Sequence, residues 1–278
     1  MTQSKGQTRV YCLYGQPVSH SYSPRIFNYT FEKLGMNRAY FPFEVSPEML
    51  GRAVEAACTL GFDGFNVTMP HKAAILKLLN KLDKTAERAQ AVNTVASTPH
   101  GLVGHNTDGE GAYRAIRTQG FDPKRKTVTV IGAGGAASAI VQRLSTEVKE
   151  ATVLDRKGAK AKLLAERTTG SARVRYGKLT KKSLEDSVQT SELLINGTPL
   201  QTPEILKSIG LTRRVLPTRL WIFDLAYNHH SRLSPSGRTI NPLEMLLQQA
   251  ALSYEIWLGK KAPIGLMRTA LTKGWRLE

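Results

Sequence analysis

The sequence has little cysteine, no long apolar run and few aromatic residues. Its 278 residues include two cysteines, Cys12 and Cys58, so we expect neither a disulfide framework nor a zinc site, and a reducing cytoplasm fits the chain. No apolar run approaches the roughly 20 residues that span a bilayer. The start of the chain, Met1 to Gly6, lacks the apolar core of a signal peptide. The six histidines form no His-Glu-x-x-His motif, so we expect no metal.

Acidic residues are scarce relative to basic ones. The chain has 39 Lys and Arg against 22 Asp and Glu, a formal net charge of +17, and such a field attracts anions. Aromatic residues make up only 7%, and no zinc finger or RNP-type motif accompanies the basic clusters. We therefore expect an anionic small-molecule substrate and a phosphorylated cofactor rather than nucleic acid. A non-catalytic binder of anionic ligands or nucleic acid remains the remote alternative.

Strands and helices alternate along the chain, which predicts an α/β fold with a largely parallel sheet. Helices are expected over 24–34 and 47–59, from Pro70, after the Gly132 loop and from residue 243 onward. Because no strand is expected after 242, the C-terminal helices should pack on structure already built. We expect one domain over 1–108, completed by 243–278, and a second over 109–242. Strands are expected at 10–14, 40–45, 65–68, 93–96, 102–104, 127–131, 152–154, 174–176, 193–195 and 221–224.

A glycine-rich loop lies between the strand expected at 127–131 and the next helix. Gly132-x-Gly134-x-x-Ala137 is a G-x-G-x-x-A fingerprint in the strand–loop–helix context that dinucleotide binding requires. Its glycines let the backbone approach a pyrophosphate, and the helix N-terminus supplies N–H donors. The residues expected to bind a cofactor here are Gly132, Ala133, Gly134, Gly135 and Ala136.

The end of the following strand carries two opposed signals for cofactor choice. Asp155 can accept from a ribose 2′-OH, which favours NAD. Arg156 and Lys157 can hold a 2′-phosphate, which favours NADP. We favour NADP and leave NAD open.

The run from Gly64 to Lys72 is the most informative stretch of the chain. Proline suits the first helical position, and apolar residues at 74, 75, 78 and 79 continue a helix after Pro70. Lys72 would then lie in the first turn, where the helix dipole disfavours a cation by roughly 0.3–1 kcal/mol. A lysine that gives up a proton can use such a position, and a solvated surface lysine is the alternative interpretation.

Four strings in fixed order precede the glycine loop. They are Gly15-Gln16-Pro17-Val18-Ser19-His20-Ser21-Tyr22-Ser23-Pro24, Asn66 to Lys72, Ala91-Val92-Asn93-Thr94 and Gly104-His105-Asn106-Thr107-Asp108-Gly109. With the glycine loop, they closely resemble the shikimate dehydrogenase family (shikimate/quinate dehydrogenases) over about residues 10–258. The resemblance implies an N-terminal α/β substrate-binding domain and a Rossmann-type dinucleotide-binding domain with a cleft between them.

The resemblance also implies an activity, the reversible NADPH-dependent reduction of 3-dehydroshikimate to shikimate in aromatic amino-acid biosynthesis. Lys72 and Asp108 match the catalytic pair, with the Lys72 ammonium donating a proton to the ketone oxygen. Taken alone, Asp108 is interpreted first as an N-cap for a helix that begins at Gly109, and Ser23 is expected to be an N-cap for the helix from Pro24 as well as a substrate residue. The implied substrate-binding residues are Ser21, Ser23, Asn66, Thr68, Lys72, Asn93, Asp108, Tyr227 and Gln249.

On the cofactor side, Asn196-Gly197-Thr198-Pro199 matches a loop of the family and adds Asn196 and Thr198 to the expected contacts. Two departures from the family's sequence leave the nicotinamide contacts and the cofactor preference open. Pro242 replaces the first glycine of a Gly-Leu-Gly segment, and proline lacks an N–H donor, so nicotinamide contacts there are open. Asp155 and Lys157 replace an asparagine and a threonine, so an NAD-preferring quinate/shikimate dehydrogenase is the alternative. The chain is expected to be a monomer or a homodimer.

Overall fold

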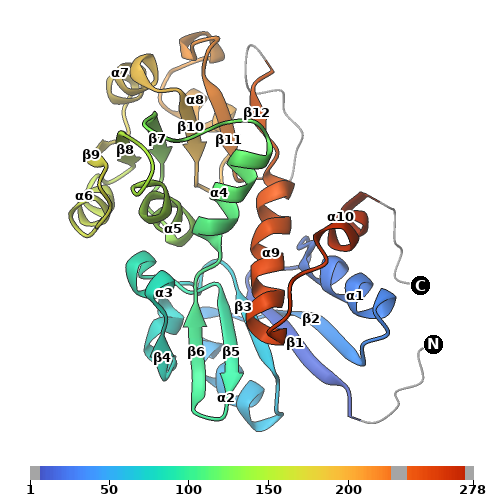
Figure 1. Ribbon diagram of the computed structural model, residues 1–278. Helices are drawn as coiled ribbons and strands as arrows, with labels where there is room; N and C mark the ends of the chain where they lie inside the picture. The colour runs from blue at the N-terminus through green and yellow to red at the C-terminus, as the bar shows by residue number, and fades with distance from the viewer. Residues whose placement is uncertain (1–6, 227–236, 273–278) are drawn as a thin grey trace. The chain divides into compact units, whose positions relative to one another are not determined.

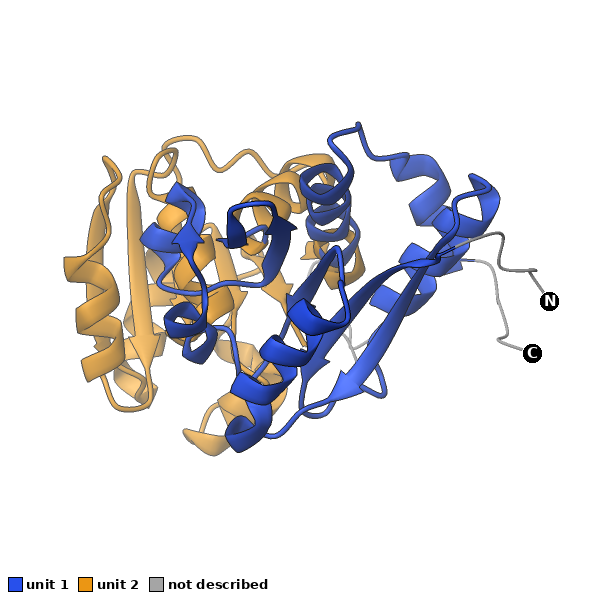
Figure 2. Cartoon of the chain, turned by 90° about the horizontal axis from the view of Figure 1, so that it is seen from below, with its two compact units in different colours: residues 1–107, 246–278 blue, residues 108–245 orange. Residues whose placement is uncertain are grey.

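The computed structural model describes residues 7–226 and 237–272, which fall into two compact units. The first unit joins both ends of the chain, Met1–Thr107 and Leu246–Glu278, and the second is the segment Asp108–Met245. Figure 2 shows the two units in different colours. Each unit is an α/β structure with its own sheet, so the expected α/β fold is confirmed.

The first unit contains a mixed sheet with strand order β2-β1-β3-β5-β6-β4 (Figure 1). Parallel pairing joins β1 to β2 and β3, whereas β5 is antiparallel to both β3 and β6. The β4–β6 pairing is parallel as well, so the expectation of a largely parallel sheet holds in this unit except at β5. Strand β5 is antiparallel because a two-residue turn, which only antiparallel strands allow, joins it to β6. The strands are β1 (Arg9–Gly15), β2 (Arg38–Glu44), β3 (Gly64–Val67), β4 (Lys81–Leu82), β5 (Thr94–Thr98) and β6 (Gly101–His105).

Helices cover both faces of this sheet, as the alternation along β1 requires. Tyr11 and Leu13 pack in one core with α1 (Ser23–Lys33), α9 (Pro242–Leu258) and α10 (Ile264–Thr272). Cys12 and Tyr14 face the other core, against α2 (Leu50–Thr59), the 3₁₀ helix η2 (Ala74–Leu78) and α3 (Lys84–Ala89). A further 3₁₀ turn, η1 (Pro47–Met49), precedes α2. The C-terminal helices α9 and α10 thus cover one face of the sheet that the N-terminal part of the chain forms.

The turn around Lys72 departs from the predicted helix. Residues 69–73 form turns, and only the short 3₁₀ helix η2 follows. The Leu76 N–H donates to the Ala73 carbonyl at 3.4 Å instead of to the Lys72 carbonyl, as an α-helix would require, and the Lys72 carbonyl accepts the Val92 N–H at 2.8 Å. The prediction that Pro70 opens an α-helix with Lys72 in its first turn is wrong, and the helix-dipole argument falls with it.

Two predicted N-caps are also wrong. Helix α1 begins at Ser23 itself, after an N-cap residue Tyr22 that makes no side-chain cap bond. The Ser23 N–H instead donates to the Ser21 hydroxyl at 3.3 Å, so Ser21 supplies the local acceptor. Likewise, α4 (Asp108–Thr118) begins at Asp108 rather than at Gly109.

The second unit is a parallel, doubly wound sheet with strand order β12-β11-β10-β7-β8-β9. Its strands are β7 (Thr127–Ile131), β8 (Glu150–Asp155), β9 (Arg173–Lys178), β10 (Leu193–Asn196), β11 (Trp221–Asp224) and β12 (Thr239–Ile240). Strand β7 lies between β8 and β10, where the direction of winding reverses, and such switch points bind dinucleotides in Rossmann folds.

Helices flank this second sheet on both faces. Side chains of α4, α5 (Gly135–Leu144) and α6 (Ala159–Glu166) share one core with β7, and those of α7 (Lys181–Thr190) and α8 (Thr202–Ser208) share the other with β10 and β11. A short 3₁₀ turn, η3 (Arg213–Val215), follows α8. No described helix is long and apolar enough to cross a membrane.

Asp83 connects α3 to the end of β6. Its Oδ1 accepts the N–H groups of Thr85 and Ala86 at 2.9 Å each, which caps α3, and its Oδ2 lies 2.8 Å from His105 Nδ1. Burial opposes the charged form, but the bonds from His105, Thr85 and Ala86 outweigh it and lower the pKa of Asp83 below its usual range.

We predict that Asp83→Ala lowers the free energy of unfolding by about 1–2 kcal/mol near neutral pH. Because the pKa of Asp83 is lower in the folded chain, its contribution is present above the unfolded value of about 4 and is lost as the pH falls through the folded value. Urea unfolding at about pH 6 and about pH 3 should therefore show that the loss in free energy of unfolding, relative to the wild type, is smaller at the lower pH. Asp186→Ala, at an exposed position of α7, is the control. A deficit equal at both pH values would contradict the prediction.

Candidate active site

The sequence strings of the first unit converge on one edge of its sheet. Strand β3 ends there, and the antiparallel β5 begins there, because Asn66 pairs with Thr94. Thr94 pairs in turn with His105, so β6 ends at the same edge. The loop that follows β1 also leaves from this edge, since β1 is parallel to β3. Strand topology therefore gathers segments that lie far apart in the sequence.

Asn66 is the centre of a buried polar network at this edge. Its side chain is only 6% exposed, and its Oδ1 accepts the Tyr40 hydroxyl at 2.9 Å. Its Nδ2 donates to the Asn93 carbonyl at 2.9 Å, to Thr94 Oγ1 at 3.0 Å and to Ser253 Oγ at 3.2 Å. Asn66 is therefore held in one orientation by β2, β5 and α9.

Asn93 continues the network toward α4 and α9. Its Nδ2 donates to Thr107 Oγ1 at 2.8 Å and to Gln249 Oε1 at 3.3 Å. Its Oδ1 accepts the Thr107 N–H at 2.8 Å and the Thr94 hydroxyl at 3.0 Å. Gln249 is oriented further by a bond from its Nε2 to the Leu246 carbonyl at 2.9 Å. The structure thus brings together three of the residues expected to bind substrate, Asn66, Asn93 and Gln249.

Four members of this network were not predicted as site residues. Thr94 and Thr107 lie inside the quoted strings, directly beside Asn93 and Asp108, and that adjacency was an available signal. Ser253 lies one helical turn after Gln249, and its hydroxyl is 2.8 Å from Thr94 Oγ1. Tyr40 carries no local signal, because its hydroxyl reaches Asn66 only through the pairing order of β2, β1 and β3.

The remaining predicted substrate residues flank the network. Ser21 is partly exposed and Ser23 is buried at the start of α1. Thr68 follows β3 directly, and its N–H donates to the Tyr14 carbonyl at 2.8 Å. Lys72 is partly exposed in the turn after β3. Tyr227 lies outside the described residues.

Asp108 is the first residue of α4 and is 4% exposed. It follows Thr107, which the Asn93 amide holds, and it opens the second unit. A carboxylate at a helix start is favoured by the helix dipole. The hydrogen bonds of Thr107 and the start of α4 together fix the backbone position of Asp108.

The glycine loop at the end of β7 has the backbone that a dinucleotide site needs. Gly132 has a φ of +97°, which side-chain-bearing residues rarely adopt, and its N–H donates to the Leu154 carbonyl at 2.8 Å. Gly134 is the N-cap of α5, and a Cβ built there meets no atom within 4 Å. The loop therefore presents open space at the N-terminus of α5, where a pyrophosphate fits.

Asp155 shapes the turn after β8. Its Oδ1 accepts the Lys157 N–H at 3.1 Å, and its carbonyl accepts the Gly158 N–H at 3.1 Å. Arg156 and Lys157 are both exposed in this turn. One Asp155 carboxylate oxygen is thus engaged with the backbone, while the two cations are presented to solvent.

Asn196 and Thr198 form a second loop beside the glycine loop. Asn196 is fully buried, and its Nδ2 donates to the Leu200 carbonyl at 2.6 Å and to Asp224 Oδ1 at 3.1 Å. Its Oδ1 accepts the Thr198 N–H at 3.0 Å and the Thr198 hydroxyl at 2.8 Å. The Asn196 side chain therefore holds the loop in shape, and a Cβ at Gly132 would lie 3.0 Å from Thr198 Cγ2.

Pro242 has a local structural role at the start of α9. It is the first residue of this helix, where its missing N–H costs no hydrogen bond. Asn241 precedes it and accepts the Leu243 N–H through Oδ1 at 2.9 Å and the Glu244 N–H through its carbonyl at 3.0 Å. The departure from glycine thus gives a well-formed helix start.

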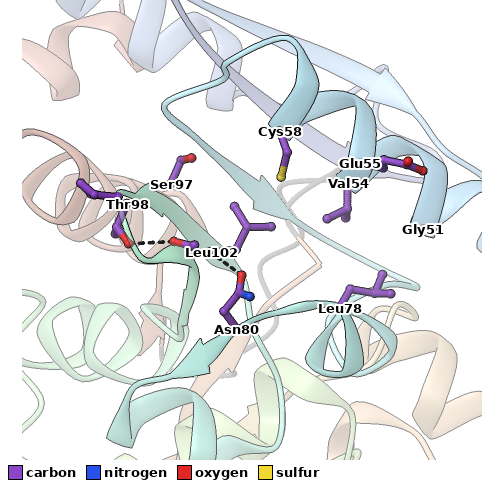
Figure 3. A pocket seen from close by; sticks show the side chains of 11 residues that line it. Gly51, Val54, Glu55, Cys58, Leu78, Asn80, Ser97, Thr98 and Leu102 are labelled. Carbon is purple, nitrogen blue, oxygen red and sulfur yellow. Dashed lines mark hydrogen bonds between the residues drawn. The ribbon is translucent and has the colours of Figure 1, made fainter.

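A surface depression of about 590 Å³ lies elsewhere in the first unit. It lies near the β5–β6 turn, and Figure 3 shows Ser97, Thr98 and Leu102 among its lining residues. Thr98 pairs with Gly101 at this end of the hairpin, whereas Thr94 pairs with His105 at the other end. Its lining includes Glu55 and the exposed, free Cys58 but none of the predicted site residues. Cys12, the other cysteine, is buried and free. No cluster of three metal-ligating side chains occurs within residues 7–226 and 237–272.

Three family models match consecutive parts of the chain. Residues 13–95 match the shikimate dehydrogenase substrate binding domain, and residues 115–228 match shikimate/quinate 5-dehydrogenase. Residues 243–272 match the shikimate 5′-dehydrogenase C-terminal domain. The matches cover most of the length of both units.

Known proteins are similar to this chain over nearly its whole length. Shikimate dehydrogenase (NADP⁺) from Alkaliphilus oremlandii is 36% identical, over 95% of this chain and 96% of the relative. The crystal structure of shikimate 5-dehydrogenase from Listeria monocytogenes with shikimate and NAD is 30% identical, with a TM-score of 0.86 over 98% of this chain and 99% of that one. The Thermus thermophilus enzyme with NADP(H) and shikimate is 28% identical, with a TM-score of 0.82 over 95% and 99%.

Proposed function

We propose that this chain, which belongs to the shikimate dehydrogenase family, catalyses the reversible reduction of 3-dehydroshikimate to shikimate with NADPH. The observation that carries the proposal is the buried network that joins Asn66, Asn93 and Gln249 at the end of the first sheet. The amides are hydrogen-bonded to their neighbours in this structure, so a ring hydroxyl of the substrate binds by replacing one of these bonds, such as the 3.3 Å bond from Asn93 Nδ2 to Gln249 Oε1. The relatives from Alkaliphilus oremlandii and Methanopyrus kandleri, at 36% and 37% identity, are named shikimate dehydrogenase (NADP⁺).

The substrate is a carboxylate with ring hydroxyls, and the residues divide accordingly. Ser21 and Ser23 donate their hydroxyls to the carboxylate from the start of α1. Asn66 and Asn93, together with Thr68 and Gln249, bind the ring hydroxyls. A site built to hydrogen-bond hydroxyls rejects analogues that lack them by about 10⁴–10⁵-fold. Tyr227 completes the proposed set.

Lys72 and Asp108 act as the catalytic pair. As the ketone is reduced, negative charge develops on its oxygen, and the Lys72 ammonium stabilises that charge and donates the proton from Nζ. In the reverse direction, Lys72 accepts the proton of the hydroxyl that is oxidised. The Asp108 carboxylate is the acidic partner of Lys72 in the proposed pair.

NADP is the cofactor, and the residues of the second unit fit it. The loop of Gly132, Ala133, Gly134, Gly135 and Ala136 holds the pyrophosphate at the start of α5. Arg156 and Lys157 hold the 2′-phosphate, while Asn196 and Thr198 shape the neighbouring loop. The nicotinamide cofactor, when bound, supplies the hydride.

An activity grid of shikimate and quinate, each with NADP⁺ and NAD⁺, tests the function. We expect the fastest turnover with shikimate and NADP⁺. The rate is measured from the absorbance of the reduced nicotinamide. No turnover in any of the four combinations would contradict the proposal. A quinate rate comparable to the shikimate rate, with NAD⁺ preferred, would favour the alternative of an NAD-preferring quinate/shikimate dehydrogenase. The Asp155 carboxylate, which can accept from a ribose 2′-OH, is the basis of this alternative.

The setting of the reaction is part of the proposal. The chain acts in the cytoplasm as a monomer or homodimer, without nucleic acid as a partner. Its two free cysteines and small-molecule chemistry support this setting. Sedimentation of the purified chain distinguishes the two oligomeric states.

A further inference from the structure

We propose that Thr107 is a positioning residue that fixes Asp108, and that it acts through a two-point hydrogen-bonded clamp on the Asn93 amide. The proposal rests on the function proposed above, because it concerns the geometry of the Asp108 carboxylate. Thr107 is 3% exposed and lies between β6 and α4. Its own side chain is assigned neither a substrate contact nor a catalytic step.

The clamp is a closed ring of two short bonds. The Thr107 N–H donates to Asn93 Oδ1, and Asn93 Nδ2 donates to Thr107 Oγ1, each at 2.8 Å. A planar amide that binds both the backbone and the side chain of one residue fixes the backbone position and the χ1 rotamer together. The backbone of the next residue, Asp108, therefore begins at a fixed position.

Asn93 is itself anchored in the sheet. Its N–H donates to the His105 carbonyl at 3.1 Å, and its carbonyl accepts the Val67 N–H at 2.9 Å. The Thr94 hydroxyl also donates to Asn93 Oδ1, at 3.0 Å. These bonds connect the clamp to β3, β5 and β6, so it has little freedom to shift.

The residue after Asp108 is constrained as well. A Cβ on Gly109 would lie 2.4 Å from the Ala139 carbonyl oxygen and 3.0 Å from its carbon, so the backbone of α4 passes directly over α5 at this point. Backbone contacts of this kind cannot be relieved by a side-chain rotation. Asp108 thus lies between a neighbour that is clamped by hydrogen bonds and a neighbour that is fixed by close packing.

The rate of catalysis is sensitive to displacements of a carboxylate as small as those that this clamp prevents. A misplacement of about 1 Å can cost about 100-fold in rate. Threonine and serine both provide the hydroxyl oxygen that accepts from Asn93 Nδ2, whereas valine has the shape of threonine without that acceptor. Valine also leaves the Thr107 N–H bond and the Asn93–Gln249 bond in place.

The test compares the steady-state kinetics of Thr107→Val and Thr107→Ser with shikimate and NADP⁺. We expect Thr107→Val to lower kcat by about 10- to 100-fold with KM for shikimate changed by no more than about twofold. Thr107→Ser should retain kcat within about threefold of the wild type, because the clamp persists. Thr98→Val is the matched control, since Thr98 bonds the Gly101 carbonyl at the far end of the same hairpin, and its kcat should be unchanged.

Several outcomes would overturn the proposal. A rise in KM at constant kcat for Thr107→Val would mean that the clamp serves substrate binding through Asn93 and does not position Asp108. An equal loss of kcat in Thr107→Ser would show that the hydroxyl is not the cause. Wild-type kcat in Thr107→Val would remove the role altogether. A wild-type chain without turnover would overturn the proposed function itself, which is a distinguishable result.

Discussion

Replacing Lys72 with alanine should lower kcat for shikimate oxidation by about 10²–10⁴-fold, the usual contribution of a positioned general acid or base. The expected change in KM for shikimate is small, because the contacts proposed for the serines, the asparagines and Gln249 remain. Steady-state kinetics with saturating NADP⁺ measures both constants. The loss is expected because the substitution removes Lys72 Nζ, the proposed donor and acceptor of the proton.

The structure gives this prediction a matched control. Lys77 belongs to η2, five residues after Lys72, and its side chain is exposed. Lys77→Ala therefore removes the same charge from the same segment and should leave kcat unchanged. If Lys72→Ala instead loses most of its affinity for shikimate at constant kcat, Lys72 is a binding residue and its catalytic role is wrong.

The second large effect is expected at Gly134. Its φ of −80° is accessible to any residue, and its Cβ direction points into open space, so Gly134→Val should fold normally. The free energy of unfolding should change by about 1 kcal/mol or less, the scale of an N-cap substitution. The added side chain fills the space assigned to the pyrophosphate. We therefore expect Kd for NADP⁺ to rise by about 100-fold or more, about 2.7 kcal/mol.

Gly132 provides the contrast that makes this test specific. Its φ of +97° and the 3.0 Å approach of a Cβ to Thr198 Cγ2 mean that Gly132→Ala should lose stability as well as cofactor binding. Calorimetric titration with NADP⁺, paired with urea unfolding in its absence, separates the two quantities. Wild-type NADP⁺ affinity in Gly134→Val would show that the cofactor does not bind at the start of α5.

Local sequence signals were sufficient where a strand is apolar and ends at a glycine or a charged residue. Strand β7 was predicted to the residue, because Thr127–Ile131 is a β-branched run that stops at Gly132. Strand β11 was also predicted to the residue, since Trp221–Asp224 ends at a carboxylate. The two-residue strands β4 and β12 are too short to give a periodic pattern, and neither was predicted.

Long-range hydrogen bonds explain what local signals missed. The predicted helix at Pro70 fails because the Lys72 carbonyl bonds Val92, twenty positions along the chain. The polar network escaped prediction for the same reason, since Asn66 reaches Ser253 across 187 positions. Asn66, Asn93 and Gln249 were assigned to the predicted site through family resemblance, whereas the contacts of Tyr40 and Ser253 depend on strand order and helix packing that one sequence does not encode locally.

The most direct test of the proposed function is the reduction of 3-dehydroshikimate by NADPH with the purified wild-type chain. The loss of nicotinamide absorbance and the identity of the product are measured in the same reaction. We expect one shikimate formed for each NADPH consumed, at a rate that Lys72→Ala reduces by orders of magnitude. A chain that binds NADPH but neither consumes it nor forms shikimate would contradict the function.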